Sequence, residues 1–230
     1  MKVGAIVLAA GKGSRMKAGI NKQFLEIQEK PILYYSLNVF ERNSNIDFIV
    51  VVCSPEEKLI IKDCIIDKYG FKKVKMLVAG GKERKDSVFN GLKVMEGVDV
   101  VLIHDGARPF INNRIIDEGI EHTLKFNCCA CGVMPVDTIK VVDGERLSKY
   151  TPKRSDLIAV QTPQCFKYDL IRECHEKVNS QGIEVTDDTS VVEYFGNKVY
   201  LYEGSYNNIK ITTPKDMIMA KEIYKNLFTK

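Results

Sequence analysis

The sequence contains no tryptophan, and its 34 basic and 30 acidic residues leave a net charge of only +4. Without tryptophan and with 9% aromatic residues, a stacking platform for single-stranded nucleic acid is not expected. The weak positive charge argues against a nucleic-acid-binding protein, although it permits a basic pocket for a phosphate-rich small molecule. No apolar run reaches 18 residues, so no transmembrane helix is expected, and we expect the protein to stay in the cytoplasm.

A disulfide framework is also not indicated. The seven cysteines are an odd number, and the single CxxC spacing, Cys128 to Cys131, has Cys129 inside it and lies in an apolar run. A reducing compartment fits this pattern better than an oxidising one. The run offers no fourth ligand at a useful spacing for a metal, so we interpret these cysteines as small buried side chains of a strand.

Of the 230 residues, 45% are hydrophobic and 28% are charged, and both fractions are ordinary for a soluble globular protein. The sequence has no internal repeat, low-complexity stretch or linker. Residues 1–230 are therefore expected to form a single domain.

Short apolar runs alternate with segments that carry apolar residues at helical spacing. The expected buried strands are Val3–Ala9, Phe48–Cys53, Val74–Ala79, Val100–His104 and Ala130–Pro135. The expected helices are Pro31–Glu41, Glu56–Lys68, Lys85–Val94 and Ile111–Lys125. This alternation predicts an α/β protein with a mostly parallel sheet and helices on both faces.

The alternation stops between residues 136 and 160. Asp143-Gly144 is a strong hairpin signal that separates two short β-like pieces, Thr138–Val142 and Leu147–Tyr150. We predict a β-arm that projects from the sheet at about residues 136–160. Beyond it, the expected elements are a helix at Leu170–Asn179, strands at Lys198–Glu203 and Asn208–Thr212, and a closing helix at Pro214–Leu227.

A glycine-rich turn, Ala-Ala-Gly-Lys-Gly-Ser-Arg-Met, follows the first strand. The backbone N–H groups of such a turn, around Gly11 and Gly13, can bind the phosphates of a nucleotide. Lys12, Arg15 and Lys22 add three cations, which suits a triphosphate in a charge-rich transition state. The turn lacks the third glycine of the dinucleotide fingerprint and the spacing of a Walker A loop. The alternative interpretation is a solvated basic loop.

Two further segments follow expected strands. Gly80-Gly81 precedes a helix on which Ser87 could bind the edge of a base, although a plain strand-to-helix turn explains the pattern equally well. Asp105 ends a buried strand, where α/β proteins bind ligands, and its carboxylate could hold Mg²⁺. Arg108, three residues later, could bind a phosphate through two hydrogen bonds.

Other polar residues divide into structural and functional candidates. We interpret His104 as structural, because no histidine cluster accompanies it and His122 and His175 are expected on helix surfaces. Thr186-Asp187-Asp188 is typical of a helix N-cap. Lys210 lies between two isoleucines in an expected strand, and a lysine there needs a partner or an open cleft, which favours a functional use.

Taken together and in order, these segments resemble the 2-C-methyl-D-erythritol 4-phosphate cytidylyltransferase family over nearly the whole chain. The matching motifs are Ala-Ala-Gly-Lys-Gly-Ser-Arg-Met with Lys-Gln-Phe, Gly-Gly-x-x-Arg with Asp-Ser-Val, His-Asp-Gly-Ala-Arg-Pro, Asp-Thr-Ile-Lys, Gln-Thr-Pro-Gln, Thr-Asp-Asp and Asn-Ile-Lys-Ile-Thr. The resemblance implies a Rossmann-like nucleotidyltransferase domain with Mg²⁺ as cofactor. It also implies a homodimer whose interlocked β-arms complete shared active sites.

The resemblance further implies the reaction. CTP and a sugar-alcohol phosphate, 2-C-methyl-D-erythritol 4-phosphate, would give 4-diphosphocytidyl-2-C-methyl-D-erythritol and pyrophosphate in the non-mevalonate route to isoprenoids. The nucleophile is a phosphate with a second pKa of about 6, so it is largely dianionic at neutral pH and needs no general base. This chemistry agrees with the lack of a convincing catalytic histidine.

Individual roles follow from the resemblance by position. Arg15, Lys22 and Lys210 match the catalytic cations, and Ala9, Ala10, Gly81 and Ser87 match contacts to cytidine. Asp105, Arg108 and Thr186 match substrate contacts within one subunit, with Asp105 also near the metal, whereas Thr138 and Arg154 match contacts from the partner's arm. Lys82 stands where the family often has an acidic residue that contacts the base, which leaves backbone contacts at that position.

Three alternatives remain for the activity. Ribitol-5-phosphate cytidylyltransferases share the fold and many motifs, but Ala10 and the segment Asp105-Gly106-Ala107-Arg108 favour the methylerythritol family. A non-catalytic nucleotide-binding regulator is disfavoured because the expected catalytic cations and Asp105 are all present. A dinucleotide-dependent reductase is disfavoured by the missing third glycine and by Ser54, which follows the second strand in place of an acidic residue.

Overall fold

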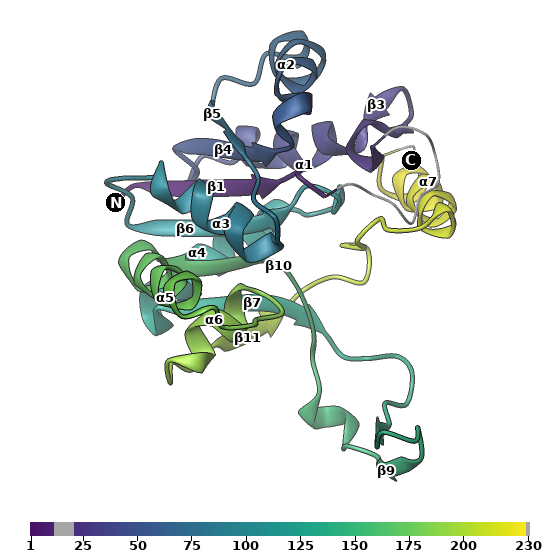
Figure 1. Cartoon of the computed structure of the whole chain (residues 1–230). Coiled ribbons are helices and arrows are strands. Elements are labelled where there is room, and N and C mark those ends of the chain that lie inside the picture. Colours follow the sequence, from purple (N-terminus) through teal and green to yellow (C-terminus); the bar gives the residue numbers. More distant parts are fainter. Residues whose placement is uncertain (12–20, 229–230) are drawn as a thin grey trace.

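A seven-stranded sheet forms the centre of the computed structural model, which describes residues 1–11 and 21–228 (Figure 1). Its strands are β1 (Val3–Leu8), β4 (Phe48–Cys53), β5 (Val74–Ala79), β6 (Val100–Asp105), β7 (Cys128–Val133), β10 (Ala159–Lys167) and β11 (Tyr200–Glu203). Their order across the sheet is β11-β7-β10-β6-β1-β4-β5. Only β10 runs against the other strands of this sheet, because it pairs antiparallel with both β6 and β7.

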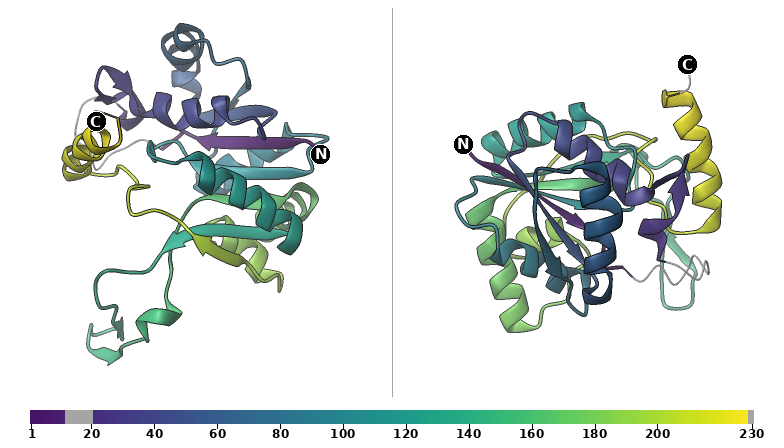
Figure 2. Two further views of the ribbon diagram at one scale, coloured as in Figure 1. Left: turned by 180° about the vertical axis from the view of Figure 1, so that it is seen from behind. Right: turned by 90° about the horizontal axis from the view of Figure 1, so that it is seen from above.

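Helices cover both faces of the sheet, as predicted (Figure 2). On one face lie α1 (Ile32–Arg42), α2 (Lys58–Ile61) with its continuation in a π-helix (Lys62–Asp67), and α4 (Asn113–Phe126). On the other face lie α3 (Arg84–Lys93), α5 (Tyr168–Gln181) and α6 (Asp188–Tyr194). Alternate residues of β1 serve the two layers, since Ala5 and Val7 pack with the first set and Ile6 packs with the second. Burial on both faces explains why the central strands β1, β4 and β6 are nearly continuous apolar runs.

A third apolar cluster attaches the C-terminal helix α7 (Pro214–Phe228) to the N-terminal part of the chain. There, Ala220 of α7 and Ile211 pack with Ile27 and with Tyr35 of α1. Ile27 belongs to a small ribbon of β2 (Glu26–Ile27) and β3 (Lys30–Pro31), which lies beside α7 in Figure 1. The chain end is thus packed close to the segment that follows the glycine-rich turn.

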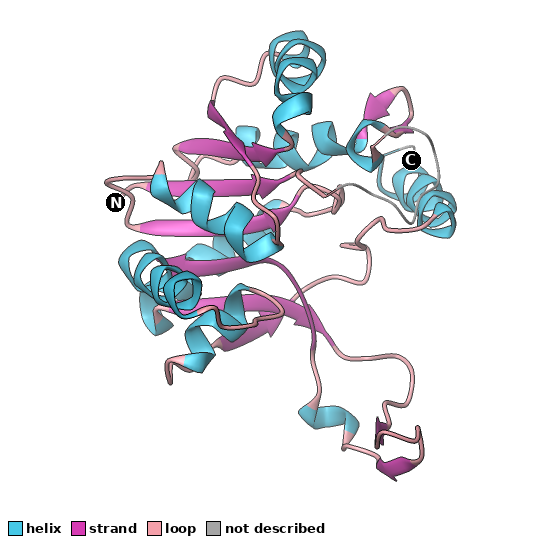
Figure 3. Ribbon diagram, viewed as in Figure 1, coloured by secondary structure: helices cyan, strands magenta, loops and turns pink. Residues whose placement is uncertain are grey.

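The segment between β7 and β10 leaves the sheet and carries a small hairpin of β8 (Val141–Val142) and β9 (Ser148–Tyr150) (Figure 3). Its turn forms at the predicted place, since the carboxylate of Asp143 accepts hydrogen bonds from the N–H groups of Glu145 and Leu147 at 3.0 and 2.9 Å. The two strands are shorter than predicted, and their ladder consists of the pairs Val141–Tyr150 and Val142–Ser148. This projecting segment, residues 134–158, is called the arm below.

Most predicted elements of the sheet and its helices are confirmed, with boundary differences of a few residues. The strand predicted at Asn208–Thr212 is wrong. Instead of joining a ladder, this segment is fixed by individual contacts, among them the Ile211 N–H to the Ala107 carbonyl oxygen at 2.9 Å and the Arg108 side chain to the Asn208 carbonyl oxygen at 2.7 Å. The irregular backbone brings Lys210 to the end of β6.

The cysteine interpretation is confirmed. Cys128, Cys129 and Cys131 are buried in β7, and all seven cysteines are free. Within residues 1–11 and 21–228, no helix is both long enough and apolar enough to cross a membrane.

Close packing of α4 on the sheet yields the first prediction. A Cβ atom at Gly119 would lie 2.7 Å from Cys165 Sγ and 2.7 Å from the hydroxyl of Tyr202, both buried. Gly119→Val should therefore lower the free energy of unfolding by about 2–3 kcal/mol, measured by urea denaturation. Glu121→Val on the exposed side of the same helix is the control and should change it by less than about 0.5 kcal/mol. Equal effects of the two substitutions would show that this contact is not tight.

Candidate active site

A cavity of about 330 Å³ opens at the carboxyl ends of β1 and β6. Eight residues predicted to be functional line it: Ala9, Ala10, Gly11, Lys22, Gly81, Ser87, Asp105 and Lys210. They come from five separate parts of the chain. Three of these parts lie at the ends of β1, β5 and β6 and meet because parallel strands end at the same edge of a sheet. Gly13 and Arg15 lie outside the described residues.

The Gly80-Gly81 turn packs too closely against its neighbours for any side chain. A Cβ atom at Gly80 would lie 2.5 Å from that of Ala10, and one at Gly81 would lie 2.2 Å from that of Asp86. Ser87 fixes the turn, because its hydroxyl accepts the Gly81 N–H at 3.0 Å and donates to the Glu83 carbonyl oxygen at 3.1 Å. The turn therefore presents backbone at the wall of the cavity.

Lys22 reaches the cavity from a 3-10 helix, η2 (Lys22–Phe24). Its Nζ lies 3.4 Å from the carbonyl oxygen of Ile211. The next residue, Gln23, is buried and its amide donates to the Ala9 carbonyl oxygen and, at 2.8 Å, to the Glu57 carboxylate. Gln23 thus ties Lys22 to the end of β1.

Three cations surround the carboxylate of Asp105, the last residue of β6. Lys210 Nζ lies 2.6 Å from Oδ2, Arg84 Nε lies 3.6 Å from Oδ1, and Arg108 Nε lies 3.8 Å from Oδ2. Burial alone would raise the pKa of Asp105, but the charges of Arg84 and Lys210 outweigh burial and hold the pKa below its ordinary value. The carboxylate is therefore ionised, and the cluster carries excess positive charge that suits phosphates.

The Asp105 backbone is fixed by Thr162 and His104. His104 Nε2 lies 3.2 Å from the Arg108 carbonyl oxygen, which can only accept, so this nitrogen carries a proton. Nδ1 then accepts the Thr162 hydroxyl at 3.1 Å, and the Thr162 oxygen accepts the Asp105 N–H at 3.0 Å. His104 is fully buried, as expected for the structural role predicted from the sequence. Burial lowers its pKa to about 4.

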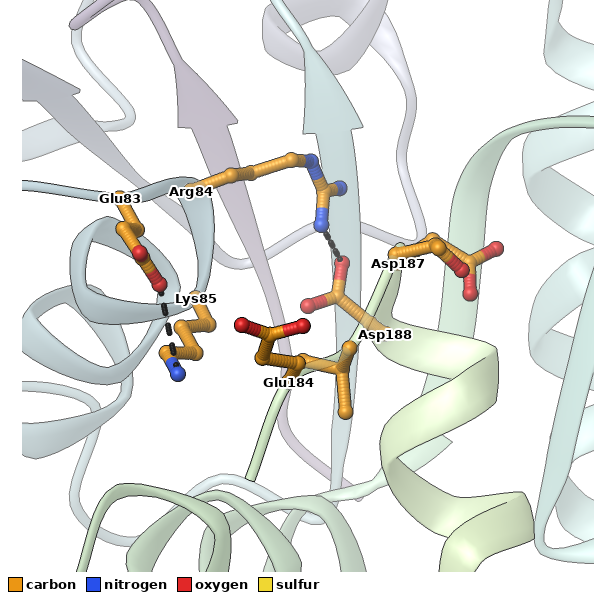
Figure 4. Close-up of a pocket in the computed structure, with 8 residues that line it drawn as sticks. Glu83, Arg84, Lys85, Glu184, Asp187 and Asp188 are labelled. Atoms are coloured by element: carbon orange, nitrogen blue, oxygen red, sulfur yellow. Dashed lines mark ion pairs between the residues drawn. The ribbon is translucent and has the colours of Figure 1, made fainter. Parts of the chain in front are cut away.

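Of the other predicted contacts, Arg108 lies beside the Asp105 carboxylate without lining the cavity, and three lie elsewhere in the same chain. Thr186 lines a neighbouring cavity of about 270 Å³, whose wall also includes Glu83 and Arg84 (Figure 4). Thr138 and Arg154 meet on the arm, where they line a third cavity of about 220 Å³. The structure thus brings eight predicted residues together and separates the two predicted to serve a partner subunit.

Arg84 and Gln23 are site residues that sequence reasoning did not single out. Both stand inside quoted motifs, but neither has a neighbour in sequence that reveals its partner. The predicted N-cap of α6 is confirmed, because the Asp187 side chain accepts the Ser190 N–H at 2.9 Å. The prediction that His175 lies on a helix surface is wrong, since it is fully buried and its Nε2 lies 3.1 Å from Asp188 Oδ1.

The described residues contain no cluster of three or more histidine, cysteine, aspartate or glutamate side chains that could hold a metal. Carboxylate oxygens in the cavity come from Asp105 and Glu83. A hard divalent cation fits this donor set if the phosphates of a nucleotide supply further oxygen ligands. Asp105 is the residue best placed to contact such a metal.

Comparison with known proteins agrees with this picture. The model of the family described as 2-C-methyl-D-erythritol 4-phosphate cytidylyltransferase matches residues 3–226. The protein of that name from Clostridium kluyveri is 58% identical over 221 residues, which cover 96% of each chain. The one from Clostridium novyi is 54% identical over 225 residues, which cover 98% of this chain and 97% of the relative.

Solved structures give the same result. A 4-diphosphocytidyl-2C-methyl-D-erythritol synthase from Anaerococcus prevotii superposes with a TM-score of 0.87 at 33% identity, covering 97% of this chain and 96% of that one. The 2-C-methyl-D-erythritol 4-phosphate cytidylyltransferase from Thermus thermophilus superposes with a TM-score of 0.79 at 27% identity, covering 98% of this chain and 100% of that one.

The fold and the comparisons define an α/β enzyme of the nucleotidyltransferase class, whose members usually use a divalent metal. Within that class, the chain belongs to the 2-C-methyl-D-erythritol 4-phosphate cytidylyltransferase family. The family and fold class predicted from the sequence are therefore confirmed.

The buried His104 predicts a pH dependence of stability. Its folded pKa of about 4 lies below the ordinary value of about 6.5, so the unfolded chain takes up the proton first as the pH falls. Neutral His104 therefore makes its full contribution to the free energy of unfolding above about pH 6.5. This contribution is lost progressively as the pH falls toward 4. When the pH falls from 7 to 5, the free energy of unfolding should decrease by roughly 2 kcal/mol more in the wild type than in His104→Gln.

The measurement is urea denaturation of both proteins at the two pH values. Both must unfold in one cooperative transition for the comparison to hold. Equal losses in the two proteins would contradict the assignment of His104 as a buried group that folds without its proton.

Proposed function

We propose that this protein transfers CMP from CTP to 2-C-methyl-D-erythritol 4-phosphate, releasing pyrophosphate and 4-diphosphocytidyl-2-C-methyl-D-erythritol. The observation that carries the proposal is the cavity in which a glycine-rich edge meets the cations around Asp105, in a chain of this family. The seven free cysteines support a reducing compartment, and we propose the cytoplasm as the site of the reaction.

The chemistry requires positioning and charge stabilisation. The attacking phosphate is already largely dianionic at neutral pH, so no general base has to remove a proton. Consistent with this, no histidine is among the described residues that line the cavity, and both nitrogens of His104 are engaged with Arg108 and Thr162. Attack on the α-phosphorus in line with the leaving pyrophosphate would build negative charge, which fixed cations stabilise.

The proposed roles combine the positions of the described residues with the family resemblance, which alone supports the roles of Gly13 and Arg15. We assign Lys22 and Lys210, together with Arg15 outside the described residues, to the α-phosphate and the attacking phosphate. We assign the cytidine to the backbone wall formed by Ala9, Ala10, Gly11, Gly81 and Ser87, with Gly13 contributing from the glycine-rich turn. Arg108 and Thr186 are proposed substrate contacts in the same chain.

We propose Mg²⁺ as the metal, held by Asp105 together with phosphate oxygens. When bound, the ion would neutralise charge on the triphosphate. Lys210 Nζ lies 2.6 Å from one oxygen of Asp105, and Arg84 Nε lies 3.6 Å from the other. The carboxylate therefore has two tasks, to gather the cations and to accept the metal that arrives with the nucleotide.

We propose that the arm forms a homodimer and completes the partner's active site. Its apolar side chains are unusually exposed for a monomer, with Val136 71%, Leu147 62% and Tyr150 60% accessible. Thr138 and Arg154 lie together on the arm, away from the cavity of their own chain. A twofold pair of arms would bring them to the partner's cavity reciprocally.

The direct test is pyrophosphate release from CTP and Mg²⁺ with either 2-C-methyl-D-erythritol 4-phosphate or ribitol 5-phosphate. The proposal predicts turnover with the methylerythritol substrate. Faster turnover with ribitol phosphate would identify the sister activity. CTP binding by calorimetry without turnover of either substrate would identify a nucleotide-binding regulator instead.

Lys22 is predicted to act in the transition state. Lys22→Ala should lower kcat by about 10²–10³-fold with a smaller effect on the KM for CTP, because it faces charge that develops during the reaction. Lys75→Ala, an exposed lysine of β5 outside the cavity, is the control. A raised KM at unchanged kcat would make Lys22 a ground-state binding residue only.

Shared sites predict complementation between inactive variants. Lys22→Ala and Arg154→Ala homodimers should each be nearly inactive, whereas a heterodimer of the two has one site with both substitutions and one intact site. Refolding a 1:1 mixture gives about half heterodimers by random pairing and should recover about a quarter of the wild-type activity.

Lys149→Ala, on the exposed strand β9 of the arm, controls for damage to the arm itself and should remain active. If mass spectrometry confirms heterodimers and no activity returns, Arg154 acts in its own chain and the shared-site proposal is wrong.

A further inference from the structure

A chain of hydrogen-bonded and ion-paired side chains leads from α5 to the wall of the active-site cavity. His175 of α5 and Asp188 of α6 are almost completely buried, with 0% and 1% exposure, and His175 Nε2 lies 3.1 Å from Asp188 Oδ1. Asp188 Oδ2 lies 2.7 Å from a terminal nitrogen of Arg84, as Figure 4 shows. The Arg84 Nε in turn faces Asp105 Oδ1 at 3.6 Å.

Hydrogen bonds hold Asp188 at one carboxylate oxygen and at its backbone N–H. A carboxylate oxygen only accepts, so His175 Nε2 is the donor in their contact. The Asp188 N–H donates to Gln164 Oε1 at 2.9 Å, and the Gln164 amide donates to Asp187 Oδ2 at 2.7 Å. Backbone and side chain of Asp188 are therefore both held, and its second oxygen is directed at Arg84.

Arg84 consequently bridges two carboxylates. It lines the proposed nucleotide cavity, and 29% of its side chain is exposed. Asp105, at one end, is the carboxylate that also holds Lys210 and Arg108. Asp188, at the other end, lies behind the cavity and contacts neither of these two cations in the described ion pairs. Without a fixed Asp188, the position of the Arg84 guanidinium would be determined only by Asp105 or by the phosphates of a bound substrate.

We propose that His175 is a positioning residue of the active site, which holds Arg84 in the cavity wall by fixing the Asp188 carboxylate. The inference rests on the proposed function for its kinetic consequence, but the geometry of Arg84 can be tested without activity. Among the hydrogen bonds and ion pairs of the described residues, His175 is linked to the cavity wall through Asp188 and Arg84, and its effect on catalysis is expected to follow that path.

The test compares His175→Phe, which removes the N–H donor, with His175→Gln, whose amide nitrogen reaches a similar position. His175→Phe should lower kcat/KM for CTP about 10–100-fold, since small misplacements of a binding group have effects of this size. His175→Gln should stay within about threefold of the wild type. Val178→Ala, a buried substitution one turn further along α5, controls for loss of packing and should leave kcat/KM near the wild-type value.

Coupling separates positioning from a general structural role. In an Arg84→Met background, His175→Phe should cause no further loss in kcat/KM, because its effect passes through Arg84. Additive losses, or a loss in Val178→Ala as large as that in His175→Phe, would overturn the proposal. Assays are run well below the lowest melting temperature of the set.

A spectroscopic measurement keeps the inference distinct from the proposed function. The Nε–H resonance of Arg84, assigned by its absence in Arg84→Met, should be dispersed and protected from exchange with water in the wild type and in His175→Gln. In His175→Phe it should move toward the random-coil position and exchange faster. If the Arg84 resonance is unchanged in His175→Phe, the positioning role is wrong, whatever the activity of the enzyme. If the resonance changes but the protein does not catalyse cytidylyl transfer, only the proposed function is wrong.

Discussion

The active site depends on one buried carboxylate, that of Asp105. An isolated ionised carboxylate at this depth would be strongly unfavourable, and it is stable only because cations compensate the lost hydration. Those cations come from three segments: Arg84 begins α3, Arg108 follows β6, and Lys210 precedes α7. The same pairing therefore neutralises Asp105 and collects the positive charge that the two proposed phosphate substrates would require.

Several features of the fold serve this arrangement. Strand β6 lies between β1 and β10, so its end is framed by the first-strand turn on one side and by Thr162 on the other. Lys210 reaches the carboxylate because residues 208–212 give up strand pairing for contacts with Ala107 and Arg108. The local irregularity that defeats strand prediction is thus the feature that completes the site.

The sequence predicts β4 well because burial imposes a continuous apolar run, and its bounds match the prediction. The bounds of β5 match as well, although this edge strand is only partly buried and carries the exposed residues Lys75 and Met76. The sequence also predicts that Ala9, Gly81 and Asp105 converge, since each follows a strand. Strand β10 was not predicted, because Pro163 and its polar neighbours disfavour a central strand. The structure accommodates Pro163 at a shift in register between Val160 and Gln164.

The partners of buried charges were not predictable in the same way. His175 lies 13 residues before Asp188, and Asp188 lies 104 residues after Arg84, so no local pattern links the three. Periodicity along α5 shows which face is apolar but does not show that a histidine on that face meets a carboxylate of the next helix. Such pairings arise from packing of α3, α5 and α6 on one face of the sheet.

The most direct test of this account is the behaviour of Asp105→Asn, measured as CTP binding without metal and as turnover across a Mg²⁺ titration. Removal of the charge frees the surrounding cations for phosphate, so CTP should bind without metal at least as tightly as to the wild type. Turnover should fall by about 10²-fold or more at ordinary Mg²⁺ and recover partly at high Mg²⁺. Normal turnover with an unchanged Mg²⁺ dependence would contradict the central role of Asp105.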